Sequence, residues 1–178
     1  SEGIVLSGID PIPERDVTFI HRTIVQGRAI EPGADREIMI GRKLAEKLRV
    51  RLGEKVVVMA QAADGELGTA AYRVGGIFAT ESSTFDSAFA YVTLPAAQSL
   101  LALGARVSTA NIRLTDRDRL GATTAQLRQL IADPGLALVP WQDTDLYFFT
   151  RNVGARSPTA ISFFFNGPAT SEIYTLGT

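Results

Sequence analysis

His21 is the only histidine in the sequence, and three acidic residues precede it within a short stretch: Asp10, Glu14 and Asp16. A histidine beside a carboxylate can act as a general base, so His21 with Asp10 or Asp16 could serve a metal-assisted hydrolase. The sequence has no serine in a G-x-S-x-G elbow for such a base to activate. A surface or partly packed histidine is therefore the favoured interpretation, and the hydrolase is the alternative.

Two D-x-D pairs could each hold a divalent cation through their carboxylate oxygens. Asp116 and Asp118 stand at the start of a predicted helix, where acidic side chains cap the backbone and suit the helix dipole. Asp143 and Asp145 lie in a region without hydrophobic periodicity, and solvated loop acids are the favoured interpretation there. We therefore predict no metal site, no cofactor and no catalytic residue.

Composition excludes further classes of function. The chain has no cysteine, so thiolate metal sites, disulfides and thiol nucleophiles are absent. Its 18 basic and 19 acidic residues leave a net charge of −1, which argues against a nucleic-acid partner because phosphate binding needs clustered excess cation. The phosphate-loop pattern G-x-x-x-x-G-K-[ST] is missing, so we expect that the chain itself does not bind ATP.

Six cations crowd into a short span of the sequence: Arg42, Lys43, Lys47, Arg49, Arg51 and Lys55. Such a cluster could contact an anionic surface such as lipid headgroups. Glu46 and Glu54 interrupt the run, and mixed charge is common on a solvated helix face. We therefore favour a solvated face over a lipid-binding surface at this point.

Hydrophobic patterning predicts an α+β fold, a mixed sheet with two packed helices and an inserted β-rich lobe over residues 37–79. The predicted strands cover 3–9, 37–40, 55–61, 70–79, 88–94, 109–115 and 136–141. A short helix is predicted at 41–48, and the two packed helices at 95–103 and 117–133. A core domain over 1–141 and a tail of uncertain structure over 142–178 follow from the loss of periodicity after Trp141.

Turn residues divide these elements. Asp64-Gly65 has hairpin chemistry, because glycine adopts positive φ at little cost. Gly75-Gly76 predicts a bulge or a close backbone approach inside a strand. We expect Asp10-Pro11-Ile12-Pro13 to end the first strand, 25–28 to form a turn and 81–86 to form a loop. A hairpin at Asn166-Gly167 is a further candidate.

The order of short motifs resembles the periplasmic core domain of FtsX-like ABC permeases, which include the lipoprotein-releasing and macrolide-exporter types. The matching segments are Gly8-Ile9-Asp10-Pro11, the IVQGR at 24–28, the EIMIG at 37–41, the LGEKV at 52–56, the YRVGGIF at 72–78, Phe85-Asp86 and the YVTL at 91–94. The resemblance covers about residues 3–141. The family continues from there toward a second membrane helix, and residues 142–178 look unlike that continuation.

The resemblance implies a non-enzymatic domain on the periplasmic face of the bacterial inner membrane, within a membrane-spanning parent protein. Its implied partners are a cytoplasmic ATPase subunit, a periplasmic carrier or adaptor protein, and a lipoprotein or other hydrophobic cargo. The chain begins at Ser1 without a signal-peptide core, and we interpret it as a piece of a longer protein. A free-standing soluble binding module is the alternative.

Partner contacts are expected on loops, because loops on a stiff scaffold carry recognition. Asp64 and Glu66 stand at the predicted hairpin tip, and Ser82, Phe85 and Asp86 stand in the predicted loop. We predict that these five residues bind the partner. Solvent-exposed connectors without a partner are the alternative for each loop.

Overall fold

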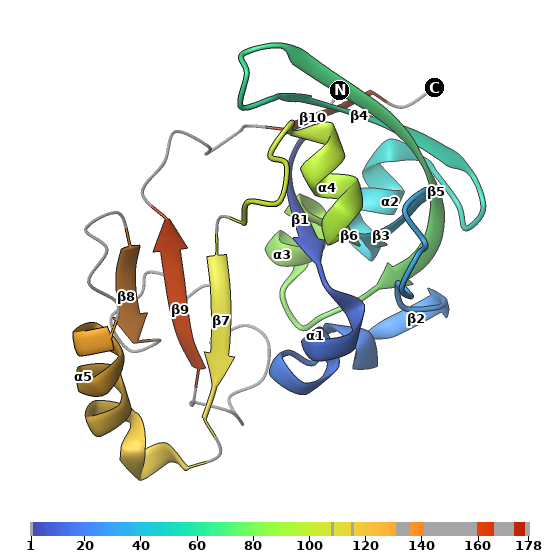
Figure 1. Cartoon of the computed structure of the whole chain (residues 1–178). Coiled ribbons are helices and arrows are strands. Elements are labelled where there is room, and N and C mark those ends of the chain that lie inside the picture. The colour runs from blue at the N-terminus through green and yellow to red at the C-terminus, as the bar shows by residue number, and fades with distance from the viewer. Residues whose placement is uncertain are drawn as a thin grey trace. The chain divides into compact units, whose positions relative to one another are not determined.

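The computed structural model describes residues 2–107, 109–114, 116–130, 136–140, 160–165 and 173–176. The chain forms two compact units (Figure 1). The first contains Ser1–Arg106 together with Thr170–Thr178, and the second contains Val107–Ala169.

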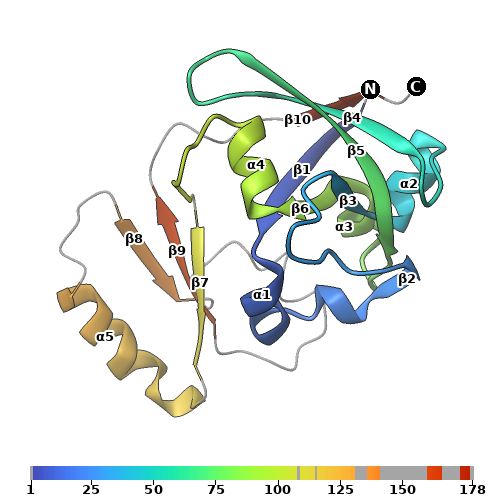
Figure 2. The same cartoon turned by 45° about the vertical axis from the view of Figure 1, so that its right-hand side comes forward.

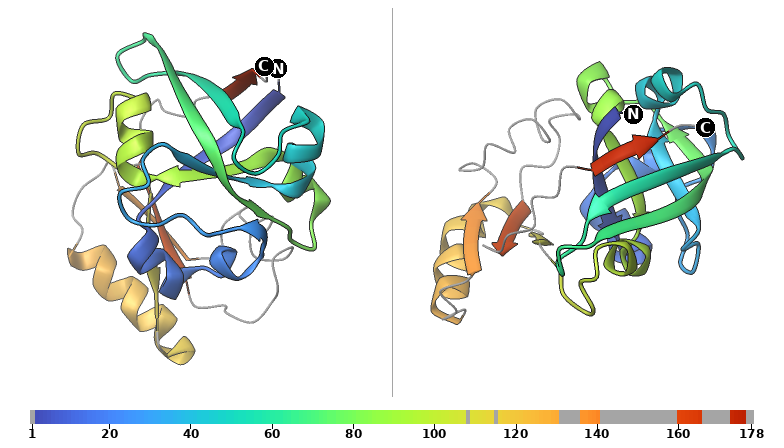
Figure 3. Two further views of the ribbon diagram at one scale, coloured as in Figure 1. Left: turned by 90° about the vertical axis from the view of Figure 1, so that its right-hand side faces the viewer. Right: turned by 90° about the horizontal axis from the view of Figure 1, so that it is seen from above.

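A seven-stranded mixed sheet forms the first unit. Its strands are β1 (Glu2–Ile9), β2 (Ile24–Gly27), β3 (Glu37–Gly41), β4 (Lys55–Gln61), β5 (Leu67–Phe78), β6 (Phe89–Thr93) and β10 (Ile173–Leu176). The strand order is β2-β5-β3-β6-β1-β10-β4, and β4 also pairs with β5. This last pairing closes the sheet into a ring, with β2 attached outside it on β5 (Figure 3).

The register explains the glycine pair in β5. Strand β3 runs parallel to β5, and its pairing shifts between Ile38, opposite Val74, and Met39, opposite Gly76. Gly75 is therefore the extra residue of a bulge, which confirms the sequence prediction. Because of this bulge, the long strand β5 can pair with β4 along its first part and with β3 along its second part as the sheet curves.

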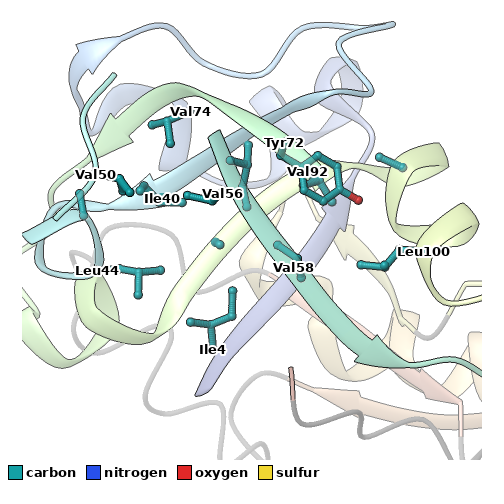
Figure 4. Close-up of a cluster of buried hydrophobic side chains, with 14 of the residues drawn as sticks. Ile4, Ile40, Leu44, Val50, Val56, Val58, Tyr72, Val74, Val92 and Leu100 are labelled. Atoms are coloured by element: carbon teal, nitrogen blue, oxygen red, sulfur yellow. The ribbon is translucent and has the colours of Figure 1, made fainter. Parts of the chain in front are cut away.

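The core fills the inside of this ring (Figure 4). Alternate residues of β4 and β5 point inward, as the period of two in a strand requires. The largest members with almost no exposure in this cluster are Ile38, Ile40, Leu44, Val56, Val58, Val74 and Val92. Burying each such side chain contributes roughly 1.5–3 kcal/mol, so the ring is the main source of stability.

Short helices join the strands: α1 (Pro11–Val17), the 3-10 turn η1 (Ile20–Arg22), α2 (Arg42–Leu48), α3 (Ser83–Ala88) and α4 (Leu94–Leu100). The prolines after β1 start a helix as well as ending the strand, because Asp10 caps it and Pro11 needs no backbone donor in the first turn. Helix α4 packs closely on β1, since a Cβ atom at Gly8 would collide with Ala97.

The second unit has a three-stranded antiparallel sheet. Its elements are β7 (Thr109–Arg113), the 3-10 turn η2 (Arg117–Arg119), α5 (Leu120–Leu130), β8 (Leu136–Pro140) and β9 (Ala160–Phe165), in the strand order β7-β9-β8. Helix α5 lies beside β8. Among the described residues, none of the helices is long and apolar enough to span a membrane.

The predicted α+β class is confirmed, and two local predictions are wrong. Residues 25–28 were expected to turn, but Ile24–Gly27 pairs with β5 as β2. Residues 81–86 were expected to form a loop, but Ser82 caps α3. The strands of the predicted lobe at 37–79 belong to the seven-stranded sheet, and the domain boundaries stay predictions. Asp143, Asp145 and Asn166-Gly167 lie outside the described residues.

Candidate functional site

The turn that joins β4 to β5 has a defined shape. The Ala62 N–H donates to the Glu66 carbonyl at 2.8 Å, and the Gly65 N–H donates to the Ala62 carbonyl at 2.9 Å. The Asp64 carboxylate accepts from the Glu66 N–H at 3.0 Å. Gly65 has φ +88°, which a glycine adopts without the penalty of a Cβ atom. The hairpin predicted at Asp64-Gly65 is therefore confirmed.

This hairpin tip, residues 62–67, is fastened to the end of α4. The Ala63 N–H donates to the Leu101 carbonyl at 2.9 Å. At Gly68, a Cβ atom would collide with the Leu100 carbonyl oxygen, so β5 and α4 approach as closely as a glycine allows. The tip is thus held at its base by a second element and does not depend on its own turn alone.

Two carboxylates and one large apolar side chain are exposed on the hairpin tip. Asp64 and Glu66 are exposed, and neither forms a salt bridge within the described part of the chain. Leu67 is 63% exposed. Sequence reasoning missed Leu67, although alternation counted back from the buried Tyr72 places it on the outer face. A surface of this kind suits a protein partner that carries cations around an apolar patch.

The second predicted contact region lies inside the fold. Phe85 is fully buried and stacks on Phe89, with ring centroids 4.2 Å apart. Asp86 is 1% exposed and accepts from the Thr80 N–H at 2.9 Å and the Thr80 hydroxyl at 2.7 Å. Ser82 accepts from the Phe85 N–H at 3.2 Å as the cap of α3. The sequence prediction of direct partner contact needs correction at Phe85 and Asp86, because their burial leaves no surface to offer.

The groups around His21 do not prepare its imidazole to act as a general base. The ring Nε2 accepts from the Arg22 Nε–H at 3.2 Å, and the ring Nδ1 is buried with no hydrogen-bond partner among the described residues. Burial, Arg22 and Arg15 lower the pKa of His21, and Asp16 opposes them weakly. Asp10 is occupied as the cap of α1, accepting from the Ile12 N–H at 3.2 Å. The imidazole therefore lacks the carboxylate hydrogen bond that would orient it.

A small hollow beside α1 has room for about one water molecule. Its lining is Ile9, Pro11, Glu14, Arg15, Ile20, His21, Ala29, Ile30 and Met39. Burial raises the pKa of the Glu14 carboxyl, and the nearby Thr18 hydroxyl opposes part of that rise. The Thr18 hydroxyl is itself buried and makes no hydrogen bond of good geometry within the described residues. Burial and the Glu14 charge raise the pKa of the Tyr91 phenol, which stays neutral. The hollow is too small for an organic substrate.

The D-x-D pair at Asp116 and Asp118 has a local structural role. Asp116 accepts from the Asp118 N–H at 3.0 Å, which supports the capping interpretation of this D-x-D pair. Within the described ranges, no group of three or more potential ligand residues gathers to hold a metal ion. Among the described residues, His21, Asp10 and the Asp116/Asp118 pair therefore stay apart or serve the fold.

The hairpin tip and every strand of the closed sheet except β10 lie in the part of the chain that matches a known family. The model of the MacB-like periplasmic core domain matches residues 3–130, which is well over half of the chain. No curated protein matches the sequence. The family match confirms the resemblance read from the short motifs. This chain therefore belongs to the family of MacB-like periplasmic core domains.

Proposed function

We propose that this chain couples ATP-driven motion of membrane helices to the hand-over of a lipoprotein or another hydrophobic cargo to a periplasmic carrier or adaptor. Family membership makes it an extracytoplasmic domain of an ABC-transporter-type permease, on the periplasmic side of a membrane protein. It also implies an ATPase partner within the transporter and points to a transporter component rather than a known enzyme.

Stiffness supports the coupling role. A domain moved by energy released elsewhere must transmit a displacement without opening locally. Closure of the first unit's sheet through β4 and β5 pairs both edges of each strand in the ring along part of its length. The apolar cluster inside the ring then links opposite strands. A rigid body of this kind can shift a surface feature as a whole.

The observation that carries the proposal is the fixed and exposed hairpin tip. Recognition is strongest where the contact surface is ordered before binding, because less conformational entropy is lost. The tip meets this condition through the Ala63 to Leu101 hydrogen bond, and it offers Asp64, Glu66 and Leu67 to solvent. We propose these three residues as the contact with the carrier.

Charge reversal tests this contact. The double variant Asp64→Lys/Glu66→Lys should weaken capture of the carrier from a periplasmic extract by about tenfold or more, since like charges across an interface repel. The matched control is Glu31→Lys/Asp118→Lys, which makes the same change in net charge at two other exposed positions. Capture that is unchanged by the first pair, or equally weakened by the second, would contradict the proposal.

A further inference from the structure

The turn that precedes β4 gathers four cations, although the sequence shows only three of them together. Arg49, Arg51 and Lys55 follow α2 in order. Arg73 joins them from β5, because it pairs directly with Lys55 and its Nη1 donates to the Gly53 carbonyl at 2.6 Å. We call these four residues the basic turn. All four are exposed.

Nearby acids do not neutralise the basic turn. Glu46 forms its salt bridge with Lys43 at 2.7 Å, outside the turn. Glu54 accepts from the Arg51 backbone N–H at 2.7 Å and keeps its one negative charge beside the turn. Arg49, Arg51 and Lys55 form no salt bridge within the described residues. Glu37 pairs with Arg73 from β3 and forms a salt bridge with Arg28 at 2.8 Å. Four cations beside the carboxylates of Glu54 and Glu37 leave this surface with a positive charge.

The pairing of Lys55 with Arg73 places two like charges opposite each other, while Glu37 of β3 pairs with Arg73 from the other side. Like charges directly opposite each other on neighbouring strands are destabilising. Both side chains point outward, so no core packing explains the choice of residue. An anion bound across the two strands would remove this repulsion. The position therefore suits a ligand surface better than a purely structural strand pair.

An apolar side chain stands at the apex of the basic turn. Leu52 is 43% exposed, and the next residue, Gly53, has φ +85°. A Cβ atom at Gly27 would contact the Leu52 side chain, so β2 supports the leucine from one side. Figure 2 shows that this turn and the hairpin tip lie at opposite ends of the β4–β5 pair. Cations around an exposed leucine match the polar and apolar layers of a bilayer surface.

We propose that the basic turn docks on anionic lipid headgroups of the adjacent bilayer, with Leu52 entering the headgroup layer. The inference rests on the proposed function only in placing the domain beside a membrane, which its family implies. Phosphates of anionic lipids would bridge Lys55 and Arg73 and accept from Arg49 and Arg51. An acidic protein surface is the competing occupant, and binding to polyglutamate resin separates it from a lipid surface.

Vesicle flotation of the full chain tests the docking. The chain should float with vesicles of equal parts phosphatidylglycerol and phosphatidylcholine, should not float with phosphatidylcholine alone, and should be released by salt. Each cation near such a surface is worth about a fivefold change in affinity, so Arg51→Glu/Lys55→Glu, which removes two, should weaken binding by about 25-fold or more. Leu52→Ser should weaken it further without changing charge.

The controls separate docking from folding and from net charge. Lys55→Glu replaces a repulsive pair with an attractive one opposite Arg73, so the melting temperature of the double variant should not fall. Arg119→Glu/Arg128→Glu makes the same charge change at exposed positions of the second unit and should bind vesicles normally.

Three results would overturn the inference: equal binding to both kinds of vesicle, equal weakening by the control pair, or binding to polyglutamate resin without binding to anionic vesicles. Carrier capture does not enter this experiment. The variant Asp64→Lys/Glu66→Lys should therefore bind vesicles as well as the parent chain does, whether or not its capture fails.

Discussion

The hairpin tip and the segment from Thr80 to Phe89 are similar in sequence and opposite in structure. Each is a polar stretch with an aspartate, and each lies next to a buried strand. Asp64 is exposed and bonds only to its own turn, whereas Asp86 is 1% exposed and binds Thr80 through two groups. Acidic composition is thus the same, and burial decides which aspartate can meet a partner.

The difference arises from the residues beside each aspartate. Gly65 lets the chain reverse at once, so the tip projects away from the sheet. The polar segment instead contains Phe85, which must be buried and draws α3 onto the sheet beside Phe78. A polar loop with a large aromatic residue is therefore a weaker candidate for recognition than a polar hairpin with a glycine.

Phe85→Ala should give the largest loss of unfolding free energy, and it is the most severe test of the difference between the two regions. Removing a buried aromatic side chain costs about 3–5 kcal/mol of unfolding free energy. Leu67→Ala at the hairpin tip should change it by about 0.5 kcal/mol or less, as expected for an exposed position. Urea unfolding of both variants measures the contrast, and similar losses would mean that the two regions are not different in burial.

Asp86→Ala should give the next largest effect. It leaves the Thr80 N–H without its acceptor and leaves the Thr80 hydroxyl only the Ser82 carbonyl at 3.3 Å, which costs about 1–3 kcal/mol. Asp64→Ala removes one exposed hydrogen bond and should cost about 0.5 kcal/mol. The same urea titration compares the pair. A larger loss at Asp64 would reverse our assignment of the structural and the exposed aspartate.

Glu14→Gln extends the comparison to a half-buried carboxyl. Burial raises the folded pKa of Glu14 above its ordinary value of 4.5, so its contribution to stability is present below that pH and is lost as pH rises through the folded pKa. Glutamine removes the ionised form, and the variant should be slightly more stable than the parent at neutral pH. Thermal unfolding at neutral and acidic pH should show the gain shrinking on acidification; a gain independent of pH would argue against burial as the cause.

His21→Gln should give the smallest effect and the opposite pH dependence. The folded pKa of His21 lies below its ordinary value of 6.5, so the unfolded chain binds the proton first as pH falls. Stability is therefore lost as the pH falls below 6.5 toward the folded pKa. The variant should lose less stability than the parent over that window in thermal melts. Parallel curves for the two proteins would contradict the shift.

Local patterning was sufficient to predict much of the fold. Strand β4 has the predicted bounds, because a run of β-branched residues lies between two glycine turns. The Gly75 bulge was likewise predictable from a glycine pair inside an apolar strand. Closure of the sheet was not predictable from local patterning, because it depends on the pairing of β10 with strands far from it in the sequence. The pairing of Lys55 with Arg73 belongs instead to the β4–β5 hairpin, so its register is set by the turn and not by distant strands.

The candidate contact site was predictable only in part. The hairpin at Asp64-Gly65 follows from turn chemistry, and its exposed acids follow from that turn. Phe85 and Asp86 were misplaced because the capping role of Ser82 was not recognised, so a helix was read as a loop. The fastening of the tip through Leu101 is a tertiary contact with no local signal.

Site-specific photo-crosslinking in living cells tests the coupling proposal most directly. A photoreactive residue placed at Glu66 of the parent permease should capture a soluble periplasmic protein, and the yield should fall when the ATPase cannot hydrolyse ATP. The same residue at Thr84, exposed in the first turn of α3, serves as the control and should give little product. Equal capture at both positions, or capture at Glu66 that ignores ATP hydrolysis, would contradict a hairpin tip that hands cargo to its carrier.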